Sequence, residues 1–180
     1  MKSVGIFIVL TFVLSSCTST RSLSRKFSEK PERISQQFSD AKHANSGERK
    51  GYYSGETGLW TTLAMYHQEN DTLPEVSNNA VIKLSLIDNK VLKVTAFEEE
   101  QMIGSFEIPV RKRSKYLILK SKIKTIPIPL FFSMNEDKAI LATLKNGALG
   151  YYHYTDETLW ILFFGASNTG RVMHEYQPIP

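Results

Sequence analysis

Few residues in this chain have side chains that could carry out catalysis or hold a metal. Its 180 residues include one cysteine and four histidines, His43, His67, His153 and His174. No two histidines stand four residues apart, the cysteine has no partner, and no glutamate lies at metal-ligand spacing from two histidines. The sequence also contains neither a Gly-x-Ser-x-Gly nucleophile elbow nor a phosphate-binding glycine loop. These patterns predict a protein that is not an enzyme and that holds no metal or other cofactor.

The single cysteine closes an apolar segment at the N-terminus. Lys2 supplies a positive charge, and residues 4–14 are apolar apart from Gly5 and Thr11. A membrane-spanning helix needs about 20 apolar residues, whereas the apolar region of a secretory signal peptide has about 7–15. The segment therefore predicts a signal peptide.

The end of this segment, Leu14-Ser15-Ser16-Cys17, resembles the lipobox of bacterial lipoproteins. The resemblance implies that residues 1–16 are removed and that Cys17 becomes the acylated first residue, with three acyl chains that anchor the protein to a membrane. It also implies a location in the bacterial cell envelope. The outer membrane is expected because Thr18 is not the aspartate that favours inner-membrane retention. The alternative is an ordinary cleaved signal peptide with an unrelated cysteine.

Residues 17–50 are expected to form a polar tether. From Thr18 to Lys50 the chain is rich in Ser, Lys, Arg, Glu and Gln and has few large apolar residues. A short helix can begin at Pro31, because apolar residues recur there at spacings of three to four. The basic residues of the tether could contact anionic lipid headgroups, or the segment could be a solvated spacer.

Residues 51–180 show the period of two that is typical of β-strands. The expected strands are 59–67, 80–88, 91–97, 102–108, 116–122, 130–134, 139–144, 148–154, 159–164 and 172–176. Turns are expected at 88–90, 98–100, 146–147 and 165–170, and no helix is expected among the strands. Short consecutive strands joined by tight turns predict an all-β fold, an antiparallel up-and-down meander that closes into a barrel of about 8–10 strands.

Apolar residues on one face of these strands are the candidate lining of the barrel interior. They are Ile82, Leu84, Val94, Phe106, Leu117 and Leu119. At this strand number an interior is either filled by side chains or holds one small ligand. Two functions follow: the barrel binds a small apolar or amphipathic, lipid-like molecule, or it is filled and serves as a structural or protein-interaction accessory of the envelope.

Three short patterns resemble the lipocalins, small barrels that enclose apolar ligands and include bacterial lipoproteins. Gly58-Leu59-Trp60 is similar to their Gly-x-Trp signature, and Thr155-Asp156 and Arg171 are similar to the second and third motifs, in the same order. The resemblance implies a lipocalin-like barrel in which Gly58, Trp60 and Arg171 are structural. Trp60 would pack across the closed end of the barrel, and Arg171 would lie over it.

The charge and the aromatic content of the chain indicate which classes of partner it can bind. The most basic segment begins with Arg111-Lys112-Arg113, which could face lipid headgroups or an anionic ligand, or could form a solvated loop. A net charge of +4 is too small to predict a nucleic-acid partner. The aromatic residues between Tyr151 and Phe164 favour core packing over a ligand-binding wall. The expected partners are therefore a membrane, through the acyl chains, and a lipid-like ligand.

Overall fold

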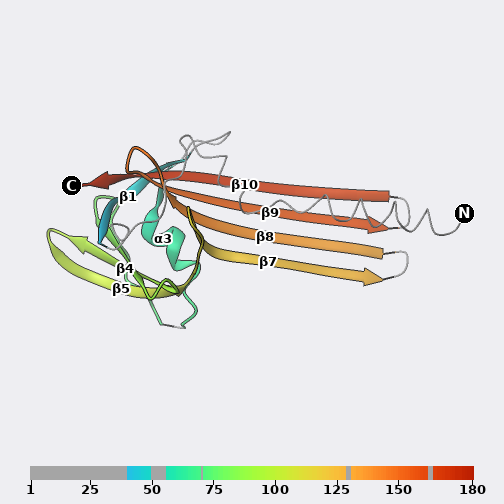
Figure 1. The fold of residues 1–180 in the computed structure, drawn as a ribbon, viewed down its shortest axis with the longest axis horizontal. Coiled ribbons are helices and arrows are strands. Elements are labelled where there is room, and N and C mark those ends of the chain that lie inside the picture. The colour runs from blue at the N-terminus through green and yellow to red at the C-terminus, as the bar shows by residue number, and fades with distance from the viewer. Residues whose placement is uncertain (1–39, 50–55, 70, 129–130, 162–163) are drawn as a thin grey trace, which may run out of the picture.

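The structure is a computed structural model that describes residues 40–49, 56–69, 71–128, 131–161 and 164–180. These residues form ten strands and one short helix (Figure 1). The elements are β1 Ala41–Arg49, β2 Glu56–Gly58, α3 Leu59–Ala64, β3 Val81–Ile87, β4 Val91–Glu98, β5 Gln101–Pro109, β6 Arg111–Lys112, β7 Leu117–Ile128, β8 Phe131–Thr143, β9 Leu149–Ile161 and β10 Phe164–Ile179. The predicted signal peptide, Cys17 and the tether up to residue 39 lie outside the described residues. Among the described residues there is no helix with the length and apolar character needed to span a membrane.

All ten strands belong to one antiparallel sheet. Its order is β5-β4-β3-β1-β10-β9-β8-β7-β6, and β2 pairs with β1. Neighbouring strands follow the order of the chain, and the first and last strands, β1 and β10, pair with each other. The predicted all-β, antiparallel fold is confirmed. The sheet is not closed by hydrogen bonds among the described strands, because β5 and β6 form its two ends.

Three of the four predicted turns are confirmed. Asp88 and Asn89 have φ of 49° and 57°, and Glu99 and Glu100 have φ of 48° and 65°, as tight hairpin turns require. Gly147, with φ of 81°, follows β8 in the turn that leads to β9. The predicted turn at 165–170 is wrong, because these residues are part of β10.

The strand predicted over 59–67 is wrong as well, because residues 59–64 form the helix α3. Leu59, Trp60 and Leu63 are buried there, and this spacing places them on one side of a helix. The helix has only six residues. Its own sequence is too short to stabilise it in isolation, so contacts with the surrounding strands must do so.

The predicted tether overlaps a strand of the sheet. Residues 41–49 form β1, which pairs with β3 on one side and with β10 on the other. Its inward residues are His43, Asn45 and Gly47, all buried. The strand was not predicted because its buried positions carry polar residues or glycine instead of apolar side chains.

The second half of the sheet has longer strands than the sequence predicted. The segments expected at 130–134 and 139–144 form one strand, β8, and those expected at 148–154 and 159–164 belong mostly to β9. Their central residues include Glu136, Asp137, Asp156 and Glu157, which the sequence analysis assigned to connections. Pairing with a neighbour on both sides holds these charged segments in strand conformation.

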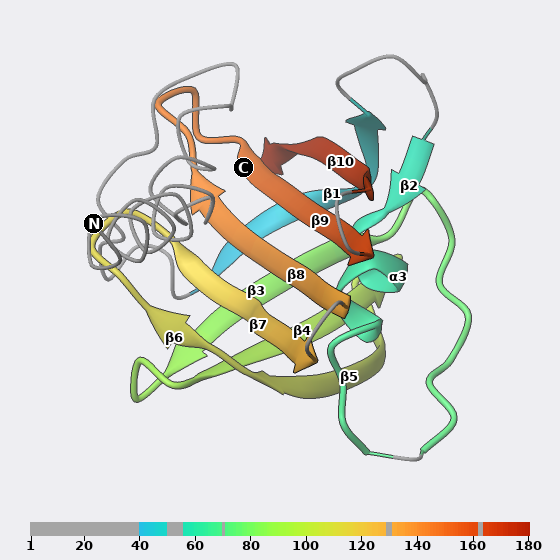
Figure 2. The same cartoon turned by 90° about the vertical axis from the view of Figure 1, so that its right-hand side faces the viewer.

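The molecule has two regions, a body and a projection. In the body the sheet curls so that β3 and β4 lie across the core from β8 and β9, with α3 among them (Figure 2). Beyond the body, β7 to β10 continue as a flat four-stranded extension (Figure 1). We refer to this extension as the finger: residues 120–128, 131–139, 153–161 and 164–172. Eight residue steps at about 3.4 Å give it a length of about 27 Å.

Candidate functional site

The six predicted lining residues come together in the body. Ile82, Leu84, Val94 and Leu117 have no solvent exposure, Phe106 is almost fully buried, and Leu119 is partly buried against the same cluster. These residues come from four strands, β3, β4, β5 and β7. The period of two therefore identified a set of side chains that share one interior.

Helix α3 contributes large side chains to this same interior. Leu59, Trp60 and Leu63 belong to the cluster, and the ring of Trp60 meets Phe106 edge to face with 4.7 Å between ring centroids. The indole N–H of Trp60 donates to the carbonyl oxygen of Pro74 at 3.1 Å. Packing beside it is tight, since a Cβ added to Gly104 would come within 2.7 Å of the Pro74 ring. A helix thus occupies space that the sequence analysis left open for a ligand.

Asn45 fixes the start of this helix. Gly58 is the N-cap residue and has no side chain to accept a hydrogen bond. Instead, the side-chain oxygen of Asn45 accepts from the backbone N–H of Trp60 at 2.8 Å, which is the bond an N-cap side chain usually makes. The amide nitrogen of Asn45 donates to the carbonyl oxygen of Ser77 at 2.7 Å. One buried side chain thus joins β1, α3 and the loop before β3, and no local sequence signal predicts it.

The interior also holds hydroxyl groups and imidazole rings. The hydroxyls of Tyr66 and Tyr151 lie 2.7 Å apart, and Tyr176 shares a hydrogen bond of 3.1 Å with Thr62. Burial raises the pKa of Tyr66 and of Tyr176 to about 12. Burial also lowers the pKa of His43 to about 4. A hydrogen bond with the backbone of Tyr176 has the opposite effect on this pKa, but the effect of burial is larger.

These buried groups are neutral at ordinary pH, and the hydroxyls are paired with each other. The hydroxyls thus satisfy one another inside the core, whereas Nδ1 of His43 is buried without a hydrogen-bond partner among the described residues. No apolar pattern in the sequence predicts that these groups lie in the interior. The only local signal is the two-residue spacing of His174 and Tyr176, which places both side chains on one face of β10.

The residues that suggested a lipocalin occupy different positions from those expected. Gly58 ends the short strand β2 and is the N-cap residue of α3, whereas Trp60 lies inside the helix and is buried among the core residues. Arg171 is exposed in the finger, with its guanidinium 5.8 Å from the ring centre of Tyr154. The expectation that Arg171 covers Trp60 is therefore wrong. Thr155 and Asp156 lie within β9 and not between two strands.

One group of side chains has the composition of a metal site. Ligand atoms of His67, Glu69 and Asp71 lie within 4.8 Å of one another. His67 accordingly has a raised pKa, first through a hydrogen bond with the carbonyl oxygen of Glu107 and then through Asp71, whose carboxylate lies 2.6 Å away. His67 and Asp71 form an ion pair, and the exposed carboxylate of Glu69 lies 4.0 Å from the same imidazole.

The basic run Arg111-Lys112-Arg113 lines an open groove at one side of the body. Its other lining residues include Asn89, Lys90 and Val110. The ammonium of Lys112 donates to the side-chain oxygen of Asn89 at 2.8 Å. The run therefore consists of β6 and the residue that follows it, and lies beside the β3–β4 turn on the surface of the body.

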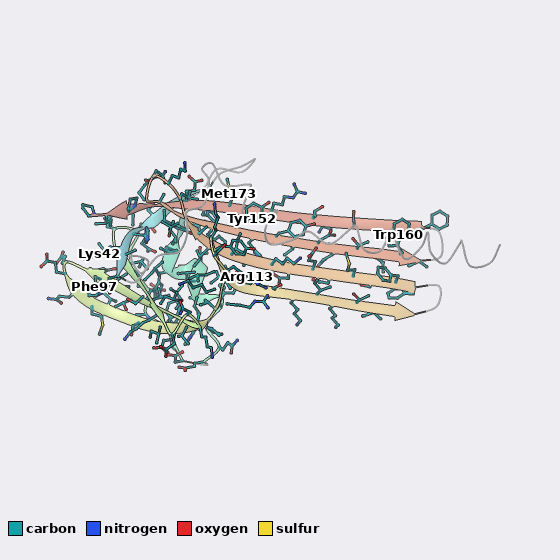
Figure 3. All side chains as sticks on the ribbon, viewed as in Figure 1. Lys42, Phe97, Arg113, Tyr152, Trp160 and Met173 are labelled. Atoms are coloured by element: carbon teal, nitrogen blue, oxygen red, sulfur yellow. The ribbon has the colours of Figure 1, made fainter. Side chains whose placement is uncertain are left out.

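The finger carries a second concentration of exposed side chains, at its far end (Figure 3). Five large apolar residues are exposed there: Ile126, Leu159, Trp160, Ile161 and Phe164. We refer to these five residues as the apolar tip. Sequence analysis assigned the aromatic residues of this region to the core, because an apolar run in one strand does not show whether another layer will cover it.

Comparison with family models, with curated proteins and with solved structures found no match for this chain. The function proposed below therefore rests on the sequence and on the geometry of the described residues.

Proposed function

We propose that this chain is an envelope lipoprotein whose β-domain has a filled interior and acts through its surface, as a structural or protein-interaction accessory. The supporting observation is the packing of the predicted lining residues against α3. Leu84, Val94 and Leu117 share one cluster with Leu59 and Trp60, and each of these side chains is at most 3% exposed. A ligand of drug size needs on the order of 300 Å³ or more. The helix fills the part of the interior where such a ligand would lie.

We further propose that the body is a barrel whose gap is bridged by the chain itself. β5 ends at Pro109 and β6 begins at Arg111, so Val110 connects the two ends of the sheet. The N–H of Val110 donates to the carbonyl oxygen of Lys90 at 2.7 Å, and its side chain belongs to the core. The barrel would then be closed between β5 and β6 by the continuous chain through Val110, without hydrogen bonds between these two strands.

The membrane location belongs to the same proposal. Residues 1–17 lie outside the described residues, so acylation of Cys17 rests on the lipobox resemblance. Cleavage before Cys17 would leave the β-domain attached through residues 18–40. Placement in the bacterial envelope, at the outer membrane, follows from the same motif.

A tryptophan titration tests the filled interior against the ligand-binding alternative. The chain has two tryptophans, so a Trp160→Phe variant leaves Trp60 as the reporter of the interior. We expect its emission to show no saturable change when a fatty acid or a lysolipid is added. We also expect solvent extraction of the purified protein to release no stoichiometric lipid besides any attached to Cys17.

A saturable response would favour the lipid-binding barrel instead. In that case Phe106→Ala, which removes the ring packed against Trp60, should weaken the response. The Met102→Ala variant is the matched control, because Met102 is exposed on the neighbouring part of β5.

A further inference from the structure

The apolar tip lies at the end of the finger, where β7 to β10 are in register. Ile126, Leu159, Trp160 and Ile161 are 37–49% exposed, and Phe164 is 81% exposed. Phe131 and Phe132, half-buried, complete the same end of the sheet. Large apolar side chains this exposed mark a contact surface when they gather in one place.

The register of the strands places these side chains on both faces of the sheet. Phe131, Ile161 and Phe164 pair across three strands and therefore share one face. Phe132 pairs with Trp160 in the neighbouring row and lies on the opposite face. Trp160 also covers Gly165, where an added Cβ would come within 2.6 Å of the indole ring. The tip is therefore apolar on its two sides.

Polarity changes sharply along the finger. The two rows at the end of the described sheet contain no charged residue, and neither does the next, which pairs Ile126, Ser133, Leu159 and Ala166. The fourth row, from Thr125 to Ser167, has no charged residue and contains three polar residues and Met134. In the fifth row Lys124 pairs with Asn135, and Glu157 pairs with Asn168. Three apolar rows cover a depth of about 7 Å.

This arrangement fits a lipid bilayer better than a protein surface. A flat protein partner covers one face of a sheet, and a stable interface buries about 800 Å² on each partner. A tip of a few side chains, divided between two faces, does not present that area in one plane. Lipid surrounds an inserted tip on all sides, and an indole in a shallow apolar end suits the membrane interface.

Charge on the edge strand is complementary to anionic lipid. Lys120, Lys122 and Lys124 alternate along β7 and lie on one face, and all three are exposed. Lys120 forms an ion pair with Asp137, farther from the tip than Lys124. The two lysines nearer the tip are placed to meet headgroups when the apolar rows insert.

The open edges of the finger limit the depth of insertion. Beyond the body, β7 and β10 each have a described neighbour on one side only. Unpaired backbone N–H and C=O groups are costly in the hydrocarbon region, which excludes deep insertion of such edges. We propose that the apolar tip inserts shallowly into the interfacial layer of a phosphatidylglycerol-containing bilayer.

This insertion does not depend on acylation of Cys17, and the two are compatible. Residues 18–40 span at most about 80 Å when fully extended. Lys42 pairs with Ile179, at the end of β10 opposite Phe164, so the start of β1 lies up to fifteen residue steps, or about 51 Å, from the tip. The extended tether is longer than this distance. A chain anchored through Cys17 can therefore place its tip in the same membrane.

The test is quenching of Trp160 by lipids that carry bromine on their acyl chains. The full processed chain is bound to or reconstituted with vesicles of phosphatidylcholine and phosphatidylglycerol, with and without bromine. Because Trp60 is 3% exposed in the core, we expect the bromolipid to quench only the emission that the Trp160→Phe variant removes. An Ile161→Asp, Phe164→Asp double variant should lose this quenching, and Lys122→Glu with Lys124→Glu should reduce its dependence on phosphatidylglycerol.

Met102→Asp is the matched control, because Met102 is 64% exposed but lies in β5 of the body. In this variant the bromolipid should quench Trp160 as strongly as in the wild type. Unchanged Trp60 emission verifies that each variant is folded. The proposal is overturned if the wild-type chain floats with the vesicles while Trp160 stays unquenched, or if the double aspartate variant is quenched normally. A second copy of the chain is the other possible contact of the tip. The proposal is also overturned if Trp160 stays unquenched and if, without vesicles, the wild type sediments as an oligomer that the double variant does not form.

Discussion

At the scale of single residues, Asn45 has more consequences for the fold than any charged group described above. Replacing it by alanine leaves the N–H of Trp60 buried without its partner, whereas the carbonyl of the exposed Ser77 still accepts from the N–H of Ala80. An unsatisfied buried group costs about 1–3 kcal/mol, so we expect Asn45→Ala to lower the free energy of unfolding by that amount. Urea denaturation measures this. Asn45→Asp, which keeps the acceptor for Trp60, should be less damaging, and equal losses for both variants would contradict the capping role.

His43 gives the stability of the protein a defined pH dependence. Its pKa is about 4 in the folded protein and 6.5 when unfolded, so the unfolded chain binds the extra proton first. The stabilisation is complete above the unfolded value and is lost as the pH falls from 6.5 towards 4. The loss amounts to about 3 kcal/mol.

A His43→Gln variant tests this, because glutamine does not titrate. Between about pH 7 and about pH 4 the wild type should lose more unfolding free energy than the variant, by about 2–3 kcal/mol. Denaturant titrations at the two pH values provide the comparison. If both proteins lose the same amount, another group is responsible.

At the scale of elements, the root of the finger is held by one carboxylate. Asp137 on β8 accepts from Lys120 on β7 at 2.6 Å and from His153 on β9 at 2.9 Å. Burial alone would raise the pKa of Asp137, but these two hydrogen bonds outweigh it and lower the pKa. Three strands are thereby tied at the point where they leave the body.

Asp137→Asn should loosen the finger without affecting the body. The pair with Lys120 is partly solvent-screened, so we expect a loss of about 0.5–1 kcal/mol. Hydrogen exchange should speed up at backbone amides of the finger and stay unchanged in β3 and β4. Glu157→Gln is the control, because its bond with Asn135 is exposed and longer, at 3.3 Å. Faster exchange throughout the molecule would show that Asp137 supports the whole fold.

At the scale of the whole molecule, the predicted anchor determines where the β-domain is held. The proposed processing at Ser16–Cys17 would remove residues 1–16, and acylation would add lipid mass to the remaining chain. Intact-mass analysis of the membrane fraction should show both changes. A Cys17→Ser protein should show neither, and if it is nevertheless fully membrane-bound with unchanged mass, the lipobox interpretation is wrong.

The sequence by itself determined the features that depend on neighbouring residues. Alternation placed Ile82, Leu84 and Val94 on one buried face, and turn residues marked the hairpin at Asp88 and Asn89. Both are local, since side chains alternate along any strand and a tight turn needs particular backbone angles. The antiparallel all-β fold followed from them.

The tertiary structure alone decided which segments join the sheet and what fills it. β1 is a strand because β3 and β10 supply hydrogen-bond partners on both sides, although His43 and Asn45 carry no apolar pattern. α3 is a helix because distant strands bury Trp60 and Asn45 caps its start. The finger extends beyond the core because long strands pair with each other there. These outcomes depend on contacts between residues far apart in the chain, and local periodicity contains no information about such contacts.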